Sequence, residues 1–104
     1  METPVSARAA ILLALTRSKG FGLELIERVS EKTNGAVNLG QGSVYPLLRS
    51  LEEEGLVRSW EADATPERGG RPRRYYELTG EGRRVASEHG ATLRRIIGLA
   101  EVTV

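Results

Sequence analysis

The sequence of 104 residues has no cysteine and a single histidine. Without cysteine the chain can form neither a disulfide nor a thiolate-bound zinc or iron–sulfur site, which fits a reducing compartment. His89 has no second histidine with which to hold a metal ion or relay a proton. We therefore expect no metal, no cofactor and no enzymatic activity, and we assign His89 to the surface or to an interface.

Long apolar runs are also missing. The longest run, residues 9–15, is far shorter than the roughly 20 residues that span a membrane, and no basic segment precedes it as in a secretory signal. The length suits one domain with a single core. We expect a soluble, cytoplasmic protein that has no membrane segment.

The charges nearly cancel over the whole chain, with 15 basic and 14 acidic residues, but they are unevenly distributed. Residues 68–84 contain six arginines and two glutamates, which gives this segment a net charge of +4. The remainder of the chain is net acidic. Such a local excess of arginine predicts an anion-binding surface.

Apolar residues recur at helical spacing in three segments of the first half. The pattern predicts helices over residues 5–17, from about 22 to 33, and from 41 or 43 through 54. Gly55 supplies the left-handed conformation that commonly ends a helix. The third helix is expected to bury Val44, Leu47, Leu48 and Leu51.

After Gly55 the apolar pattern changes to an alternation of period two. Two strands are predicted, over residues 56–61 and 73–78, and the segment between them is rich in proline and glycine. These strands form an antiparallel hairpin whose tip is rich in arginine. We assign Trp60, on the first strand, to packing.

The C-terminal segment, from residue 80 onward, has an apolar seam of helical spacing. Thr79 is a suitable N-cap, and Glu81 is placed near the positive end of the helix dipole. Gly90 and Gly98 lower the stability of an isolated helix, so this helix needs a partner helix. The seam residues that we assign to dimerisation are Ala86, Leu93, Ile97, Ala100 and Val104.

This order of elements defines the predicted fold class. Three helices, a two-stranded hairpin and a long helix make a mostly α protein with a β-hairpin wing. We predict a winged helix-turn-helix over residues 1–79, followed by a C-terminal dimerisation helix over residues 80–104. In such a fold the third helix enters the DNA major groove, and the hairpin tip reaches the flanking backbone or the minor groove.

Two segments resemble the PadR family of bacterial transcriptional regulators. Residues 40–57, GQGSVYPLLRSLEEEGLV, are similar to the family pattern P-G-T-L-Y-P-A-L-x-R-L-E-x-x-G-L-I, and residues 70–79, GRPRRYYELT, to its wing strand G-x-x-R-K-Y-Y-x-L-T. The two segments at this separation are more specific than either alone. The resemblance covers nearly the whole chain and is to the small subfamily with one C-terminal dimerisation helix.

The sequence departs from the family pattern at two places. Residues 21–25 read FGLEL where the family commonly has H-G-Y-E-L, so any contacts of that histidine and tyrosine are missing here. Gln41 stands where a proline is frequent, and its amide is suited to reading a base edge.

The candidate DNA-binding residues lie on the third helix and on the hairpin. They are Gln41, Ser43, Tyr45 and Arg49 on the helix, and Arg68, Arg71, Arg73 and Arg74 on the hairpin. An alternative reading makes the helix residues a solvated turn with Tyr45 packed beneath the wing, and makes the arginines a merely soluble hairpin tip. Arg73 and Arg74 face opposite ways in a strand, so we do not expect equal contacts from both.

The resemblance implies a homodimeric transcriptional repressor that binds double-stranded DNA at a pseudo-palindromic operator. It also implies release by a small hydrophobic or phenolic effector, whose candidate walls are the first helix and Leu93, Ile96 and Ile97 of the last helix. The competing hypothesis is a winged-helix protein-interaction module that does not bind DNA. That module predicts that charge reversal at Arg71 and Arg73 leaves function intact.

Overall fold

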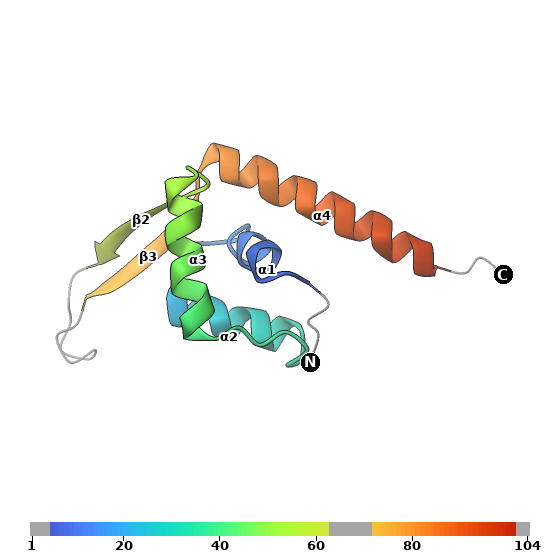
Figure 1. Cartoon of the computed structure of the whole chain (residues 1–104), viewed down its shortest axis with the longest axis horizontal. Coiled ribbons are helices and arrows are strands. Elements are labelled where there is room, and N and C mark those ends of the chain that lie inside the picture. Colours follow the sequence, from blue (N-terminus) through green and yellow to red (C-terminus); the bar gives the residue numbers. More distant parts are fainter. Residues whose placement is uncertain (1–4, 63–71, 102–104) are drawn as a thin grey trace.

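The computed structural model describes residues 5–62 and 72–101. Three short helices form the body of the molecule, a small sheet lies at one end, and a long helix runs across the body and extends beyond it (Figure 1). The elements in chain order are α1 (Ala7–Ala14), β1 (Gly20–Phe21), α2 (Gly22–Lys32), α3 (Gln41–Glu53), β2 (Val57–Ala62), β3 (Arg73–Leu78) and α4 (Gly80–Ala100).

The core forms where the apolar faces of the first three helices meet the inner face of the sheet. Ile11 and Leu12 of α1, Leu25 of α2 and Leu48 of α3 are completely buried. Burial of a side chain of this size stabilises the fold by about 1.5–3 kcal/mol. This shared core holds α3 in a fixed position relative to the sheet.

Helix α1 is shorter than the predicted span of residues 5–17. Ser6 defines its start, because the Ser6 hydroxyl accepts a hydrogen bond of 3.1 Å from the backbone N–H of Ala9. Its end is held by Arg28 of α2, whose guanidinium donates to the carbonyl of Ala14 at 2.7 Å. A tertiary contact therefore ends this helix before the apolar pattern does.

The two following helices confirm the prediction closely. Helix α2 ends at Lys32, after which Asn34 and Gly35 have φ values of 52° and 79°. Helix α3 is followed by Gly55 at φ 77°, which is the predicted left-handed stop.

The sheet has one strand more than the predicted hairpin. The two-residue strand β1 pairs antiparallel with β3, so that Gly20 lies opposite Tyr76 and Phe21 opposite Tyr75. The strand order is β1-β3-β2. The predicted hairpin of β2 and β3 is confirmed. Strand β1 was not predicted, because two residues are too few to show an alternating pattern.

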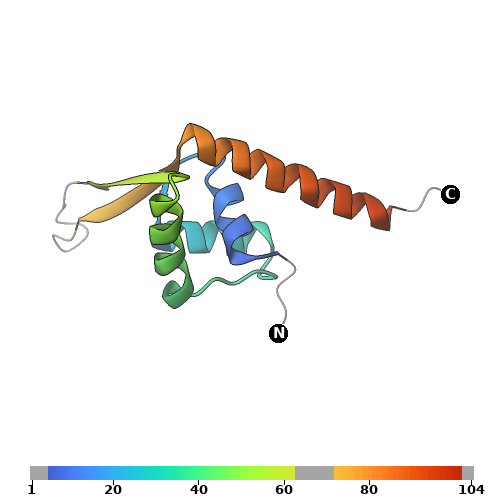
Figure 2. The same cartoon turned by 45° about the horizontal axis from the view of Figure 1, so that its top comes forward.

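Helix α4 begins at the predicted cap. The Thr79 hydroxyl accepts a hydrogen bond of 3.0 Å from the N–H of Gly82 and donates one of 2.6 Å to the carbonyl of Gly55. The first half of α4 packs on α1, and its second half extends past the body (Figure 2). No helix in the described part of the chain is long and apolar enough to cross a bilayer.

Ala86 requires a correction to the predicted dimer seam. Its side chain is completely buried in the core of its own protomer. It is therefore unable to contact a second chain, and the exposed seam starts further along α4. Val104 lies outside the described residues.

Candidate nucleic-acid interface

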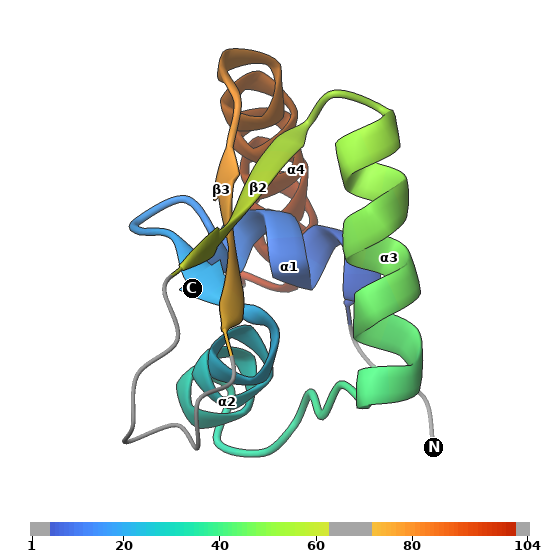
Figure 3. The same ribbon diagram turned by 90° about the vertical axis from the view of Figure 1, so that its left-hand side faces the viewer.

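Helix α3 and the β-hairpin lie on the same side of the molecule. Figure 3 shows α3 beside β2 and β3, with α1 and α4 behind them. Val57 and Leu78, which are paired across the hairpin and buried, belong to the same hydrophobic core as Leu48 and the other buried residues of α3. This shared packing sets the position of the hairpin relative to the exposed face of α3.

The predicted helix residues are all exposed on α3, but they do not form one stripe. Gln41, Tyr45 and Arg49 follow at intervals of four residues, along the edge of α3 that turns toward the sheet and α2. Ser43 lies about 200° around the helix from Tyr45 and so occupies the opposite edge. The exposed face is therefore bordered by these two groups, with Gly42 and Pro46 between them.

Tyr45 packs against the start of α2, at Gly22. A Cβ atom placed on Gly22 would lie 2.5 Å from Cε1 of the Tyr45 ring and 2.7 Å from its hydroxyl oxygen. The ring thus lies directly on the backbone of Gly22, and only glycine leaves room for it. Tyr45 is still 38% exposed. This role of Gly22 was not predicted, although the segment FGLEL contains the glycine of the family pattern.

The charges on α3 are separated along its length. Its first ten residues contain Arg49 and no acid, whereas Glu52 and Glu53 lie at its C-terminal end and Glu54 follows directly. The N-terminal end also has the positive pole of the helix dipole. This end of α3 is therefore the one suited to a polyanion.

Two of the three acids at the C-terminal end are engaged within the protein. Arg8 of α1 forms a bidentate pair with Glu54, with both N–O distances at 2.7 Å. Hydrogen bonding from Arg8 lowers the pKa of Glu54, and the same bond raises the pKa of Arg8. Glu52 accepts hydrogen bonds of 2.8 and 2.9 Å from the Ser59 hydroxyl of β2.

The two candidate arginines of strand β3, Arg73 and Arg74, point to opposite faces of the sheet, as predicted. Arg74 donates to the Ser59 hydroxyl at 2.8 Å and lies 3.5 Å from Glu61, on the face toward α3. The Arg73 guanidinium lies 4.2 Å from the ring centroid of Phe21 on the outer face. Arg68 and Arg71 lie outside the described residues.

Trp60 belongs to an aromatic cluster on the outer face of the sheet. It stacks on Tyr75 with ring centroids 6.1 Å apart, and Phe21 meets Tyr75 edge-on at 5.6 Å. The ammonium of Lys19 lies 5.6 Å from the Trp60 centroid and 5.8 Å from that of Tyr75. Trp60 is therefore a packing residue, as predicted. The aromatic cluster joins β1, through Phe21, to both strands of the hairpin.

Within residues 5–62 and 72–101, no group of three histidine, aspartate or glutamate side chains lies close enough together to hold a metal ion. The geometry of this side of the molecule is that of a binding surface. An exposed helix whose first ten residues contain Arg49 and no acid lies beside a hairpin that contains arginine.

Comparison with known proteins agrees with this geometry. The model of the transcriptional regulator PadR-like family matches residues 11–88. The chain belongs to the PadR-like family. Members of this family are transcriptional regulators and not enzymes.

Solved structures of PadR proteins share the fold. A PadR-like transcription factor from Bacteroides fragilis is 26% identical, with a TM-score of 0.73 over 89% of this chain and 84% of that one. A PadR family regulator from Clostridium difficile R20291 is 25% identical, also at 0.73, over 88% and 91% of the two chains. PadR of Bacillus subtilis, solved in complex with operator DNA, is 20% identical at 0.69, over 78% of this chain and 44% of that one.

Proposed function

We propose that this PadR-family protein is a cytoplasmic, homodimeric transcriptional repressor that binds a pseudo-palindromic operator. The observation that supports this most is the placement of the acid-free half of α3 beside the arginine-containing hairpin. The similar PadR of Bacillus subtilis was crystallised with operator DNA, which supports the same use of this surface.

In the proposed complex the N-terminal half of α3 lies in the major groove. The groove is about 12 Å wide and accepts one helix. The Gln41 amide is suited to a base edge, and the hydroxyls of Ser43 and Tyr45 to phosphate oxygens. The exposed guanidinium of Arg49 is suited to either a base edge or a phosphate. The hairpin arginines, Arg68, Arg71, Arg73 and Arg74, contact the flanking backbone or the minor groove.

The proposed dimer forms through the second half of α4. Ile96, Ile97 and Leu99 are 55%, 59% and 86% exposed on a helix that extends away from the body. Apolar side chains gathered in this way mark an interaction surface. Leu93, Ile97 and Ala100 lie at helical spacing on this segment and form the proposed seam. A two-fold axis through it would place two α3 helices in successive major grooves, roughly 34 Å apart.

Release by a small hydrophobic or phenolic effector completes the proposal. Such an effector must bind one arrangement of the two DNA-binding heads more tightly than the other, because equal affinity for both shifts nothing. Leu93, together with α1, is one wall of a cavity in the protomer. Ile96 and Ile97 lie farther along α4, where the partner protomer would complete the site.

A mobility-shift titration across salt concentration tests DNA binding directly. With about two phosphate contacts per wing and one or two per helix, the logarithm of the affinity should fall with the logarithm of salt at a slope of about −5 to −7. Arg49→Ala should weaken binding by about 1–3 kcal/mol. Arg84→Ala is the matched control, because Arg84 pairs with Glu81 and Glu88 on α4, away from the proposed interface. A flat salt dependence, or equal losses in the two variants, would instead favour the protein-interaction module.

A further inference from the structure

A chain of polar contacts joins the β-hairpin, which is the wing, to the C-terminal half of helix α3. We propose that Glu52 of α3 and Ser59 of β2 are positioning residues, which fix the angle of the wing relative to α3 so that both reach the same DNA. The inference rests on the proposed function, because it names the residues that align its two DNA-contacting parts.

The contacts run from β3 through β2 to α3. Nη1 of Arg74 donates to the Ser59 hydroxyl oxygen at 2.8 Å. The hydroxyl in turn donates its one proton to the Glu52 carboxylate, whose two oxygens lie 2.8 and 2.9 Å away. Because Ser59 accepts from Arg74 and donates to Glu52, each bond polarises the other. The bond to Ser59 takes one of the five N–H donors of Arg74, so the same guanidinium can also meet a phosphate.

The bond between Ser59 and Glu52 lies at the point where the hairpin leaves the core. The side chains of β2 that face α3 are those of Val57, Ser59 and Glu61, because alternate residues of a strand share a face. Val57 is buried in the core, Ser59 is half-buried and Glu61 is exposed. Apolar packing therefore holds the base of the hairpin, and the polar chain continues the contact with α3 toward the tip.

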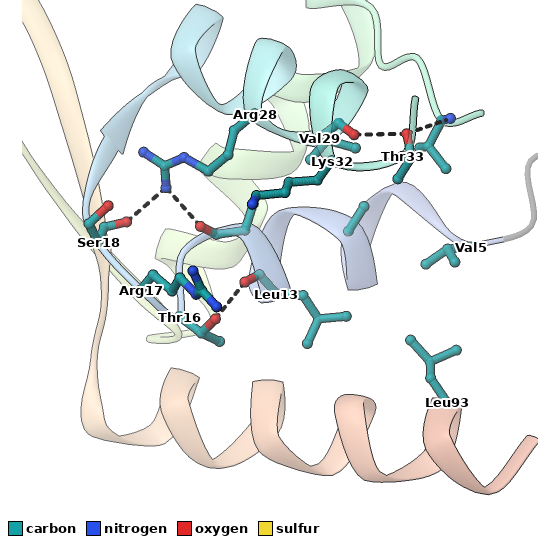
Figure 4. A pocket seen from close by; sticks show the side chains of 13 residues that line it. Val5, Leu13, Thr16, Arg17, Ser18, Arg28, Val29, Lys32, Thr33 and Leu93 are labelled. Carbon is teal, nitrogen blue, oxygen red and sulfur yellow. Dashed lines mark hydrogen bonds between the residues drawn. The ribbon is translucent and has the colours of Figure 1, made fainter. Parts of the chain in front are cut away.

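The other edge of the wing is held by different residues. Strand β1 pairs with β3 along that edge. Arg28 of α2 holds the segment just before β1, since it donates to the carbonyl of Ser18 at 3.0 Å (Figure 4) and to that of Lys19 at 3.1 Å. The bond between β2 and α3 restrains the opposite edge, so that the two edges together set the angle of the wing.

The position of the outer part of the hairpin depends on this angle. Ala62 and its partner Arg73 are the outermost paired residues of the two strands. At a rise of about 3.3 Å per residue, they lie roughly 10 Å beyond Ser59. A rotation of roughly 10° about Ser59 would move them by roughly 2 Å, and a hydrogen bond of about 2.9 Å does not survive such a shift.

The sign of the effect separates this role from simple electrostatics. Glu52 is an exposed acid on the helix that is proposed to enter the DNA groove. On charge alone, removal of Glu52 should strengthen DNA binding, because an anion no longer repels the phosphates. If Glu52 aligns the wing, its removal weakens binding instead. Glu53 is the matched control, since it is also exposed and forms no ion pair with the described residues.

Mobility-shift titrations of the full-length protein test this on one duplex, selected from a random library by the wild-type protein. Glu52→Ala and Ser59→Ala should each weaken binding at least fivefold, and the double variant should be little weaker than either, because all three break one contact. Glu53→Ala should bind as tightly as wild type or more tightly. Unchanged or tighter binding by Glu52→Ala, or additive losses in the double variant, would overturn the proposal.

Glu52→Gln separates the hydrogen bond from the charge. It removes the same charge as Glu52→Ala but keeps an acceptor for the Ser59 hydroxyl, so it should bind at least twofold more tightly than Glu52→Ala. Equal affinities of the two variants would contradict the role of the hydrogen bond. Urea denaturation shows whether each variant folds, and Ser59→Ala, which loses a single hydroxyl, carries the test if Glu52→Ala does not fold.

The salt dependence and the DNA footprint show which contacts are lost. In Glu52→Ala the logarithmic salt slope should become shallower by about two, as about one phosphate contact per wing is lost from the dimer although no cation is removed. Hydroxyl-radical footprinting should show the half-sites still protected and the flanks exposed. An unchanged slope, or equal loss of protection at half-sites and flanks, would overturn this inference alone. Wild-type protein that binds no duplex would instead refute the proposed function.

Discussion

At the scale of single residues, two glycines determine where the larger parts of the molecule meet. Gly82, in the first turn of α4, lies against the carbonyl of Leu56, and a Cβ atom there would overlap with that backbone oxygen. Gly22 lies equally close to the Tyr45 ring on α3, and a Cβ atom there would overlap with that ring. Neither role is visible in the sequence, because the atoms that approach each glycine come from residues more than 20 positions away.

Gly82→Ala should destabilise the protein strongly. The added methyl group meets backbone, which is unable to rotate away, so α4 has to shift from its seat, at a cost of about 3 kcal/mol. Chemical denaturation followed by circular dichroism measures the loss. Gly80→Ala is the matched control, since a Cβ atom at Gly80 meets no atom within 4 Å. Equal stability of the two variants would contradict this account of the α4 junction.

Gly22→Ala should affect DNA binding more than folding. The new methyl group meets the Tyr45 side chain, which can swing into solvent, so the cost in stability is about 1–2 kcal/mol while the ring loses its place. We expect a clear loss of affinity in a mobility-shift assay. In a Tyr45→Ala background the same substitution should have little further effect on either property, because the clash is gone. Additive losses in this double-mutant cycle would show that Gly22 acts independently of Tyr45.

At the scale of elements, the apolar spacing was sufficient to predict the helices and the two long strands. Helix α1 ended early because Arg28 holds the carbonyl of its last residue, Ala14, and β1 was missed because two residues show no period. The candidate helix residues were placed on the correct element, but only the structure separates Ser43 from the edge of Gln41 and Tyr45. The cavity shares α1 and Leu93 with the expected effector walls, but the apolar spacing did not indicate its basic residues Arg28 and Lys32, which come from α2.

The ion pair between Arg8 and Glu54 is a contact between elements that gives a pH-dependent prediction. It joins α1 to the C-terminal end of α3. Because the folded-state pKa of Glu54 lies below its ordinary value of 4.5, its contribution to stability is present above that pH and is lost as the pH falls through the lowered pKa. Glu54→Gln should therefore be less stable than wild type at pH 7, with the difference shrinking below about pH 4.

Urea denaturation at pH 3 and at pH 7 measures this difference in stability between Glu54→Gln and wild type. Glu53→Gln serves as the control, because Glu53 is an exposed neighbour that forms no ion pair with the described residues. If Glu54→Gln lowers the free energy of unfolding by the same amount at pH 3 and pH 7, the charge of Glu54 does not stabilise the fold.

At the scale of the whole molecule, the body, the sheet and α4 have different roles in the proposed function. The body positions α3, the sheet positions the hairpin arginines, and the second half of α4 supplies an apolar surface far from both. The fold class and the family followed from the sequence, since the order of elements and the two family-like segments span nearly the whole chain. The proposed dimer seam did not follow as closely, because Ala86 shares the seam spacing yet is buried in the core of the chain itself.

Selection from a random duplex library, followed by sequencing of the retained DNA, tests the central claim most directly. A two-fold dimer with one α3 per half-site should enrich an inverted repeat whose half-site centres lie about 10 base pairs apart, or a multiple of one helical turn. The same selection with Arg49→Ala should give weaker enrichment. Recovery of no preferred sequence, or of a single asymmetric site bound by one protomer, would contradict the account.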